Sequence, residues 1–148
     1  MNKCYRLLQL TNYDLGPVAV GAYIPVGTMT REVRAGSQCN DTFIVTTSNN
    51  NSIYINEQGF YKIAYTGYLE VAVAGDIVVE LQISGVTLRT ATVTAPAAGT
   101  YLVSFDFVTR ALKDCCNNVN TQLLVRLLNS GIAITDGEAN LVIERVYA

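Results

Sequence analysis

The 148-residue chain contains no histidine. It therefore lacks the commonest general base and the commonest metal ligand of proteins. The sequence also has no nucleophile elbow, zinc-protease motif, phosphate-binding glycine loop or acidic calcium loop. Carboxylate pairs such as Asp76 with Glu80, or Glu138 with Glu144, could in principle serve glycoside hydrolysis, but such residues more often occupy turns or solvated strand faces. We therefore expect no catalytic residues, no enzymatic activity and no cofactor.

Charge is also scarce, because charged residues make up 15% of the chain and hydrophobic residues 50%. An average soluble domain has about 25% charged residues. With so few charges to cover the outside, we expect part of the surface to be apolar and buried against another subunit. The net charge of −2 gives no basic footprint for nucleic acid. No run approaches the roughly 18 apolar residues of a membrane span, so we expect no membrane partner either.

The N-terminus lacks the pattern of a secretory signal. Lys3 and Arg6 come first, but the apolar piece that follows is only three leucines within residues 7–10, interrupted by Gln9. A signal peptide needs an apolar stretch of roughly 7 to 15 residues and a small-residue cleavage site. We therefore expect synthesis in a cytoplasm without a signal peptide.

Four cysteines are present: Cys4, Cys39, Cys115 and Cys116. The adjacent pair has the wrong spacing to supply two ligands of one zinc tetrahedron, so we expect no metal site. Adjacent cysteines also form a strained bridge with each other. A disulfide from Cys39 to Cys115 or Cys116 is the better oxidised state, and four reduced thiols are the alternative if the protein stays in a cytoplasm.

Residues 59–73, GFYKIAYTGYLEVAV, alternate apolar and polar side chains with a period of two, which is typical of a half-buried β-strand. We expect this long strand to fill the space between two sheets. Its inward residues are then Tyr61, Ile63, Tyr65, Leu69, Val71 and Val73. Tyr68 faces the other way, which makes it a weak interface or ligand candidate.

Turn signals separate further alternating runs, and no dozen-residue stretch has a helical period. Only residues 110–118 could form a helical turn. Residues 17–27 are expected as an edge or end strand, because Pro17 and Pro25 cannot donate to a ladder. The other expected strands are 42–47, 52–56, 77–84, 86–94, 100–110, 121–129 and 139–148. The pattern predicts an all-β fold, an antiparallel two-sheet jelly-roll sandwich.

Some of these strands are apolar on both faces, so both faces are expected to be covered. The cover is either a loop or N-terminal segment of the same chain, or a second subunit. If it is a subunit, the interface candidates are Val78, Leu124, Leu128, Val142 and Val146.

Several motifs together resemble a known group of proteins. They are PVAVGAYIPVG, SIYINEQGFYKIAYTGYLEVAVAG, VVELQISGVTLRTATVTAP, FVTRALKDCC and the C-terminal LVIERVY, within residues 17–147. This order resembles small jelly-roll proteins from phages and prophages of gut Firmicutes. Their fold is similar to that of tumour necrosis factor and complement globular heads, and the heads of spore-surface collagen-like glycoproteins look related.

The resemblance implies a homotrimer about a threefold axis, with the last strand near the axis. It implies a non-enzymatic structural protein on the surface of a bacteriophage virion, as a head fibre, capsid decoration or tail component, made in the bacterial cytoplasm. The alternative is a module of a phage or spore-surface protein that binds glycans or a cell surface. No Gly-X-Y collagen stalk is present, which weakens the spore-surface alternative.

The resemblance leaves residues 1–16 outside the jelly roll, and Gly16-Pro17 looks like a boundary. We therefore expect two parts, an N-terminal anchoring arm at 1–16 and a jelly-roll domain at 17–148. The arm is too apolar to remain in water, so we expect it to pack either on the base of its own trimer or on other virion proteins. Its anchor candidates are Tyr5, Leu7, Leu8 and Leu10.

Overall fold

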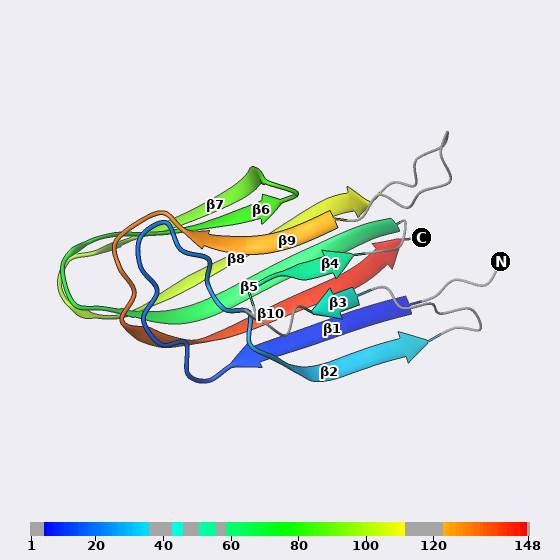
Figure 1. The fold of residues 1–148 in the computed structure, drawn as a ribbon, viewed down its shortest axis with the longest axis horizontal. Coiled ribbons are helices and arrows are strands. Elements are labelled where there is room, and N and C mark those ends of the chain that lie inside the picture. The colour runs from blue at the N-terminus through cyan, green and yellow to red at the C-terminus, as the bar shows by residue number, and fades with distance from the viewer. Residues whose placement is uncertain (1–4, 36–42, 46–50, 56–58, 112–122, 148) are drawn as a thin grey trace.

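Ten β-strands form a two-layer sandwich in the computed structural model, which describes residues 5–35, 43–45, 51–55, 59–111 and 123–147 (Figure 1). Sheet I has the order β2-β1-β10-β5-β8, and sheet II has the order β3-β4-β9-β6-β7. All pairings between these strands are antiparallel. The predicted all-β, two-sheet sandwich is confirmed. The strands are β1 (Tyr5–Asn12), β2 (Thr28–Ala35), β3 (Phe43–Val45), β4 (Ile53–Ile55), β5 (Gly59–Val71), β6 (Gly75–Ile83), β7 (Val86–Ala95), β8 (Gly99–Ala111), β9 (Leu123–Asn129) and β10 (Asp136–Tyr147).

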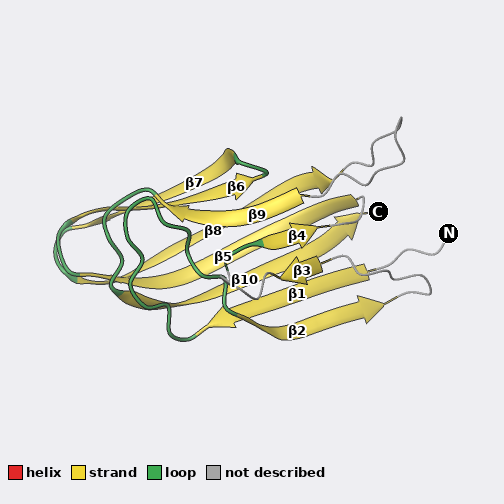
Figure 2. Ribbon diagram, viewed as in Figure 1, coloured by secondary structure: helices red, strands yellow, loops and turns green. Residues whose placement is uncertain are grey.

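The described residues contain strands and loops only (Figure 2). Among them there is no helix long and apolar enough to cross a membrane. The expected helical turn at 110–118 begins within β8, and its remainder lies outside the described residues.

Strand β5 is the long inner strand that the alternation predicts. Its inward side chains are buried from Tyr61 to Val71, while the side chains between them are exposed or half-buried. Facing them across the sandwich are the buried residues of β6 and β9 in sheet II, such as Leu81 and Val125. Val73 is a correction, because β5 ends at Val71 and the chain then turns outward, leaving Val73 59% exposed.

The N-terminal segment is part of this fold, so the prediction of a separate arm at 1–16 is wrong for residues 5–12. Strand β1 pairs with β10 from Leu7↔Glu144 to Asn12↔Ala139, and β2 pairs with its other edge. Leu8 and Leu10 are 1% and 0% exposed in the core. The reason is physical: two leucines at a period of two form the buried face of a strand, and that strand lies in the interior of a sheet.

The anchor candidates are separated accordingly. Leu8 and Leu10 point into the sandwich and cannot contact another virion protein in the folded domain. Leu7 is half-buried on the opposite face of β1, and the side chain of Tyr5 lies outside the described part of the chain. Gly16 adopts a φ of +67°, so Gly16-Pro17 marks a turn within the domain and not a boundary.

Arg6 shows how firmly β1 is held in the interior. Its side chain is fully buried, and Nη1 donates to Oε1 of Glu32 on β2 at 3.3 Å. Its Nε and Nη2 atoms are buried without a hydrogen-bond partner. Burying an incompletely paired charge is costly. If residues 5–12 were a surface arm, the guanidinium of Arg6 would therefore stay in water.

Residues 17–27 are not the expected edge strand. The chain makes only two isolated bridges there, Val18↔Ile134 and Tyr23↔Leu128. Two prolines in eleven residues remove too many donors for a continuous ladder. The edge strand is instead β2, which follows this segment at Thr28–Ala35. Its polar sequence TMTREVRA suits the edge of sheet I.

Tyr65 brings a polar group into the core. Its ring packs on Phe105 with 5.5 Å between centroids, and its hydroxyl is buried without a hydrogen-bond partner. Burial raises the pKa of this hydroxyl well above its ordinary value. Gly67 makes room for the ring, because a Cβ at that position would lie 2.8 Å from the Tyr65 hydroxyl oxygen.

Deleting residues 2–12 should prevent folding. The deletion removes Leu8 and Leu10 from the core and leaves the edge of β10 unpaired. Circular dichroism and amide proton NMR spectra of the truncated protein test this expectation. A soluble truncated protein with a cooperative thermal transition and dispersed amide signals would contradict it.

Tyr65→Phe should raise the free energy of unfolding by about 1 kcal/mol, because it removes a buried hydroxyl that has no partner. Urea denaturation measures the change.

Gly67→Ala should destabilise the wild-type protein more than it destabilises the Tyr65→Phe variant, which lacks the crowding oxygen atom. Equal effects of Gly67→Ala in the two backgrounds would show that the hydroxyl does not set the space at this position.

Candidate functional site

The outer face of sheet I, which points away from the sandwich, carries the candidate site. Register places its side chains in rows across the strands: Glu138↔Tyr68↔Leu102 is one row, and Asn140↔Thr66↔Ser104 is the next. Tyr68, Leu102 and, further along, Val108 are each about half exposed. An exposed apolar side chain is ordinary when it is alone, but these large ones share one sheet face.

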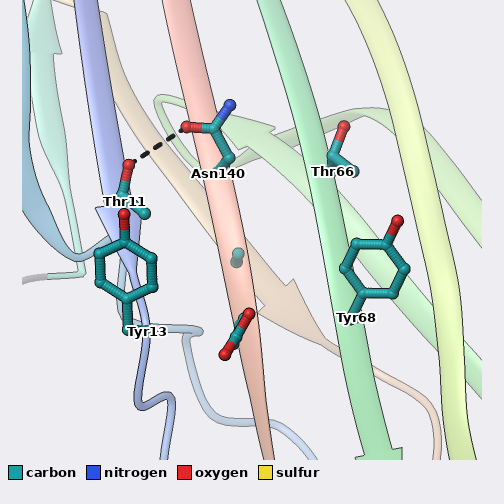
Figure 3. Close-up of a pocket in the computed structure, with 7 residues that line it drawn as sticks. Thr11, Tyr13, Thr66, Tyr68 and Asn140 are labelled. Atoms are coloured by element: carbon teal, nitrogen blue, oxygen red, sulfur yellow. Dashed lines mark hydrogen bonds between the residues drawn. The ribbon is translucent and has the colours of Figure 1, made fainter.

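A groove of about 150 Å³ opens on this face where β1, β10 and β5 run side by side (Figure 3). Tyr13, just beyond the end of β1, and Tyr68 of β5 form its two walls. Tyr13 is 75% exposed. Glu138 lies directly opposite Tyr68 in the pairing of β10 with β5, and it contributes a carboxylate to the lining between the two rings.

The upper part of the groove is polar and internally satisfied. Asn140 Oδ1 accepts a hydrogen bond from Thr11 Oγ1 at 3.4 Å (Figure 3). It also accepts one from Gln9 Nε2 at 3.1 Å. Thr11 Oγ1 also lies 3.1 Å from Thr30 Oγ1 on β2. These bonds fix the side chains of neighbouring strands, so this row is a preorganised polar surface.

Below the groove the surface becomes acidic. An adjoining hollow is lined by Glu70, Asp136 and Glu138 together with Tyr13 and Tyr68. The backbone N–H groups of Gly137 and then Gly16 lower the pKa of Asp136, and the Gly16 N–H donates to its Oδ1 at 3.1 Å. Asp136 is therefore ionised at neutral pH. The arrangement favours a cation that enters between two aromatic rings.

The five interface candidates do not form one surface. Val142 lies on the outer face of sheet I, where it pairs with Ala64 of β5, and Val146 is exposed at the β-bulge between Arg145 and Tyr147. Val78, Leu124 and Leu128 lie on the outer face of sheet II, on the opposite side of the sandwich. One threefold interface built on sheet I therefore cannot contain all five.

The second group has a cover within its own chain. Tyr23 bridges to Leu128, its ring stacks 4.8 Å from the guanidinium carbon of Arg126, and its hydroxyl donates to Gln82 Oε1 at 3.0 Å. The loop alternative considered from the sequence thus describes the sheet II face near Leu128. The subunit alternative stays a prediction for the sheet I face, for Val78 and for Leu124.

Sequence reasoning missed Leu102, Val108 and Tyr13. In TYLVSFDFVTR the inward residues Val103 and Phe105 are buried. Leu102 and Val108 occupy positions where the alternation predicts polar residues. These two breaks in the alternation are the sequence signal for exposed apolar side chains. Tyr13 gave no signal, because its position depends on how β1 ends.

The four cysteines all lie outside the described residues, so the structure does not test their pairing or redox state. Within the described ranges, no three potential metal ligands of the histidine, cysteine, aspartate or glutamate type come together.

Comparison with known proteins establishes the fold. The globular domain of zebrafish complement 1qA is similar with a TM-score of 0.66 at 11% identity, over 95% of this chain and 97% of that one. The PRD1 vertex protein P5 has a TM-score of 0.56 at 16% identity, covering 95% and 96% of the two chains. Murine APRIL has a TM-score of 0.54 at 10% identity, covering 96% and 99%.

The fold is that of tumour necrosis factor and C1q. No family model matches the sequence, and no curated protein matches it either. The expected fold is therefore shown through structures that share few residues with the chain. At such identities a shared fold carries no information about residue roles. The role of the groove between Tyr13 and Tyr68 therefore follows only from the chemistry of its own residues.

Proposed function

We propose that the protein is a non-enzymatic structural component of a bacteriophage virion surface and that it assembles as a homotrimer through the outer face of sheet I. The observation that carries the proposal is this face itself, with Tyr68, Leu102 and Val108 about half exposed on one side of a single chain. Several large apolar side chains exposed on one sheet face of a chain with few charges are typical of a protein–protein interface.

The fold supports a trimer, since tumour necrosis factor- and C1q-like domains typically form trimers. Such domains are generally binding or structural modules and not enzymes. The chain's lack of histidine agrees with this class. For the virion role, support comes from the likeness to a vertex protein of phage PRD1 and from the motif resemblance to phage jelly-roll proteins.

The revised role of β1 changes how the protein would attach to a virion. Because Leu8 and Leu10 are in the core, they are removed from the residues that could attach the protein to a virion. Mass spectrometry of purified particles from an induced host tests the virion role directly. Absence of the protein from intact particles would exclude it.

The trimer predicts a specific effect of Leu102→Asp. A charge at this position would be desolvated against the neighbouring subunit, so the variant should be monomeric at micromolar concentration while keeping its sandwich. Light scattering coupled to size exclusion measures the mass, and circular dichroism checks the fold. Val20→Asp is the matched control, because Val20 is an exposed valine in the loop between β1 and β2, and it should leave the trimer intact.

Two results would count against the trimer. A monomeric wild-type protein would remove the proposal, and a trimeric Leu102→Asp variant would move the interface off this face.

A second candidate function is glycan binding, favoured by the two exposed tyrosine rings that stand over Glu138 and Asn140. Aromatic faces pack on sugar rings, and carboxylate and amide groups bind hydroxyls. The two functions compete for one surface, because a trimer through sheet I would close the groove. A glycan array separates them: binding by the wild type that is lost in Tyr13→Ala supports the glycan function, and no binding leaves the structural one.

A further inference from the structure

Several charged side chains have no partner among the described residues, and two of them, Glu138 and Arg89, have opposite signs. Among the described residues, neither Glu138 in the groove nor Arg89 on β7 makes an ion pair or a hydrogen bond through its side chain. Both are exposed. Exposed single charges are common, so only the positions of these two decide whether they can pair between protomers.

Arg89 lies on an open edge. Strand β7 is the last strand of sheet II, and its residues 86–90 are exposed on both faces, including the apolar Val86 and Leu88. A sheet edge that presents apolar side chains and unpaired backbone groups to solvent is a surface that proteins usually cover. Strand β8, the neighbouring edge of sheet I, carries the half-exposed Leu102 and Val108 beside it.

The groove has the chemistry of a guanidinium site. Tyr13 and Tyr68 supply two ring walls, and Glu138 supplies a carboxylate between them. A guanidinium is planar, stacks on aromatic faces and pairs with a carboxylate through two parallel hydrogen bonds. Glu70 and Asp136 beside the groove add negative potential that draws a cation toward it.

Arg89 also lies at a suitable level of the sandwich. It lines a surface hollow together with Thr66 and Ser104, of the row next to Tyr68, and with Ala64 and Asp106, of the following row. Adjacent rows on one face are two residues apart, which is about 7 Å, and an extended arginine side chain spans that distance. In a threefold assembly whose axis follows the strands, equal levels of neighbouring protomers meet, so Arg89 of one protomer lies near the level of the next groove.

We propose that Arg89 of one protomer inserts between Tyr13 and Tyr68 of the next and pairs with Glu138. This inference rests on the proposed trimer and assigns its specificity. The apolar face supplies the area of contact, while the Arg89–Glu138 pair fixes the register between edge and face. Three equivalent pairs would form, since each copy presents both the edge and the groove.

A charge-reversal cycle tests the pair. Arg89→Glu and Glu138→Arg each place like charges together at the interface, so each should raise the dissociation midpoint of the trimer by about tenfold or more. The double variant restores opposite charges and should recover most of the wild-type midpoint. Analytical ultracentrifugation over a dilution series measures the midpoint.

A matched control distinguishes a specific pair from general charge balance. Glu144→Arg changes the same charge on the same face of β10, three rows from Glu138 and away from the groove. Combined with Arg89→Glu it balances the net charge as the first double variant does, yet it should not restore the trimer. Restoration by both doubles would show a diffuse electrostatic effect and would overturn the assigned pair.

The remaining outcomes separate this inference from the proposed function. If the wild type is monomeric, the trimer itself fails. If the wild type is trimeric and neither single variant weakens it, the trimer stands and the Arg89–Glu138 pair is wrong. If Arg89→Glu weakens the trimer and no double variant restores it, Arg89 meets a different group and Glu138 is excluded as its partner.

Discussion

The pairing of the first strand with the last is the constraint on which the rest of this structure depends. Strand β10 lies between β1 and β5 in the middle of sheet I, so its two edges are satisfied by one strand from the beginning of the sequence and one from its middle. Such long-range pairing has a high loop-closure cost that burial must offset. Leu8, Leu10, Leu141 and Ile143 provide that burial on the inner side of the two strands.

This constraint explains both a success and a failure of sequence reasoning. The alternation in residues 59–71 predicts the long strand and most of its buried side chains, because a period of two is a local property. The role of residues 5–12 was missed, since a Gly-Pro pair can mark either a turn or a domain boundary and only the partner strand decides between them. Strand β2 was missed because an edge strand can be polar on both faces.

The site was harder to predict than the fold, for a related reason. Parity along a strand tells which side chains point away from the core, but it does not tell which sheet the strand joins. Val78 and Val142 have the same local pattern, yet they lie on opposite sides of the sandwich. Predicting the groove requires the register between strands as well, because Tyr13, Tyr68 and Glu138 come from three segments that are brought together only by the register of sheet I.

The polar groups of the sheet I face differ in what they require from a covering partner. Asn140 and Thr11 bond to neighbouring strands, and Lys62 lies 3.9 Å from Asp106, so these groups find partners within the protomer. A surface of this kind can be buried at little cost, because its hydrogen bonds survive the loss of water. The carboxylates of Glu138, Glu70 and Glu144 differ, since they have no partner among the described residues and would lose their hydration under any cover. An apolar edge alone would therefore be a poor cover for this face, which is why we propose a covering partner that brings a cation to Glu138.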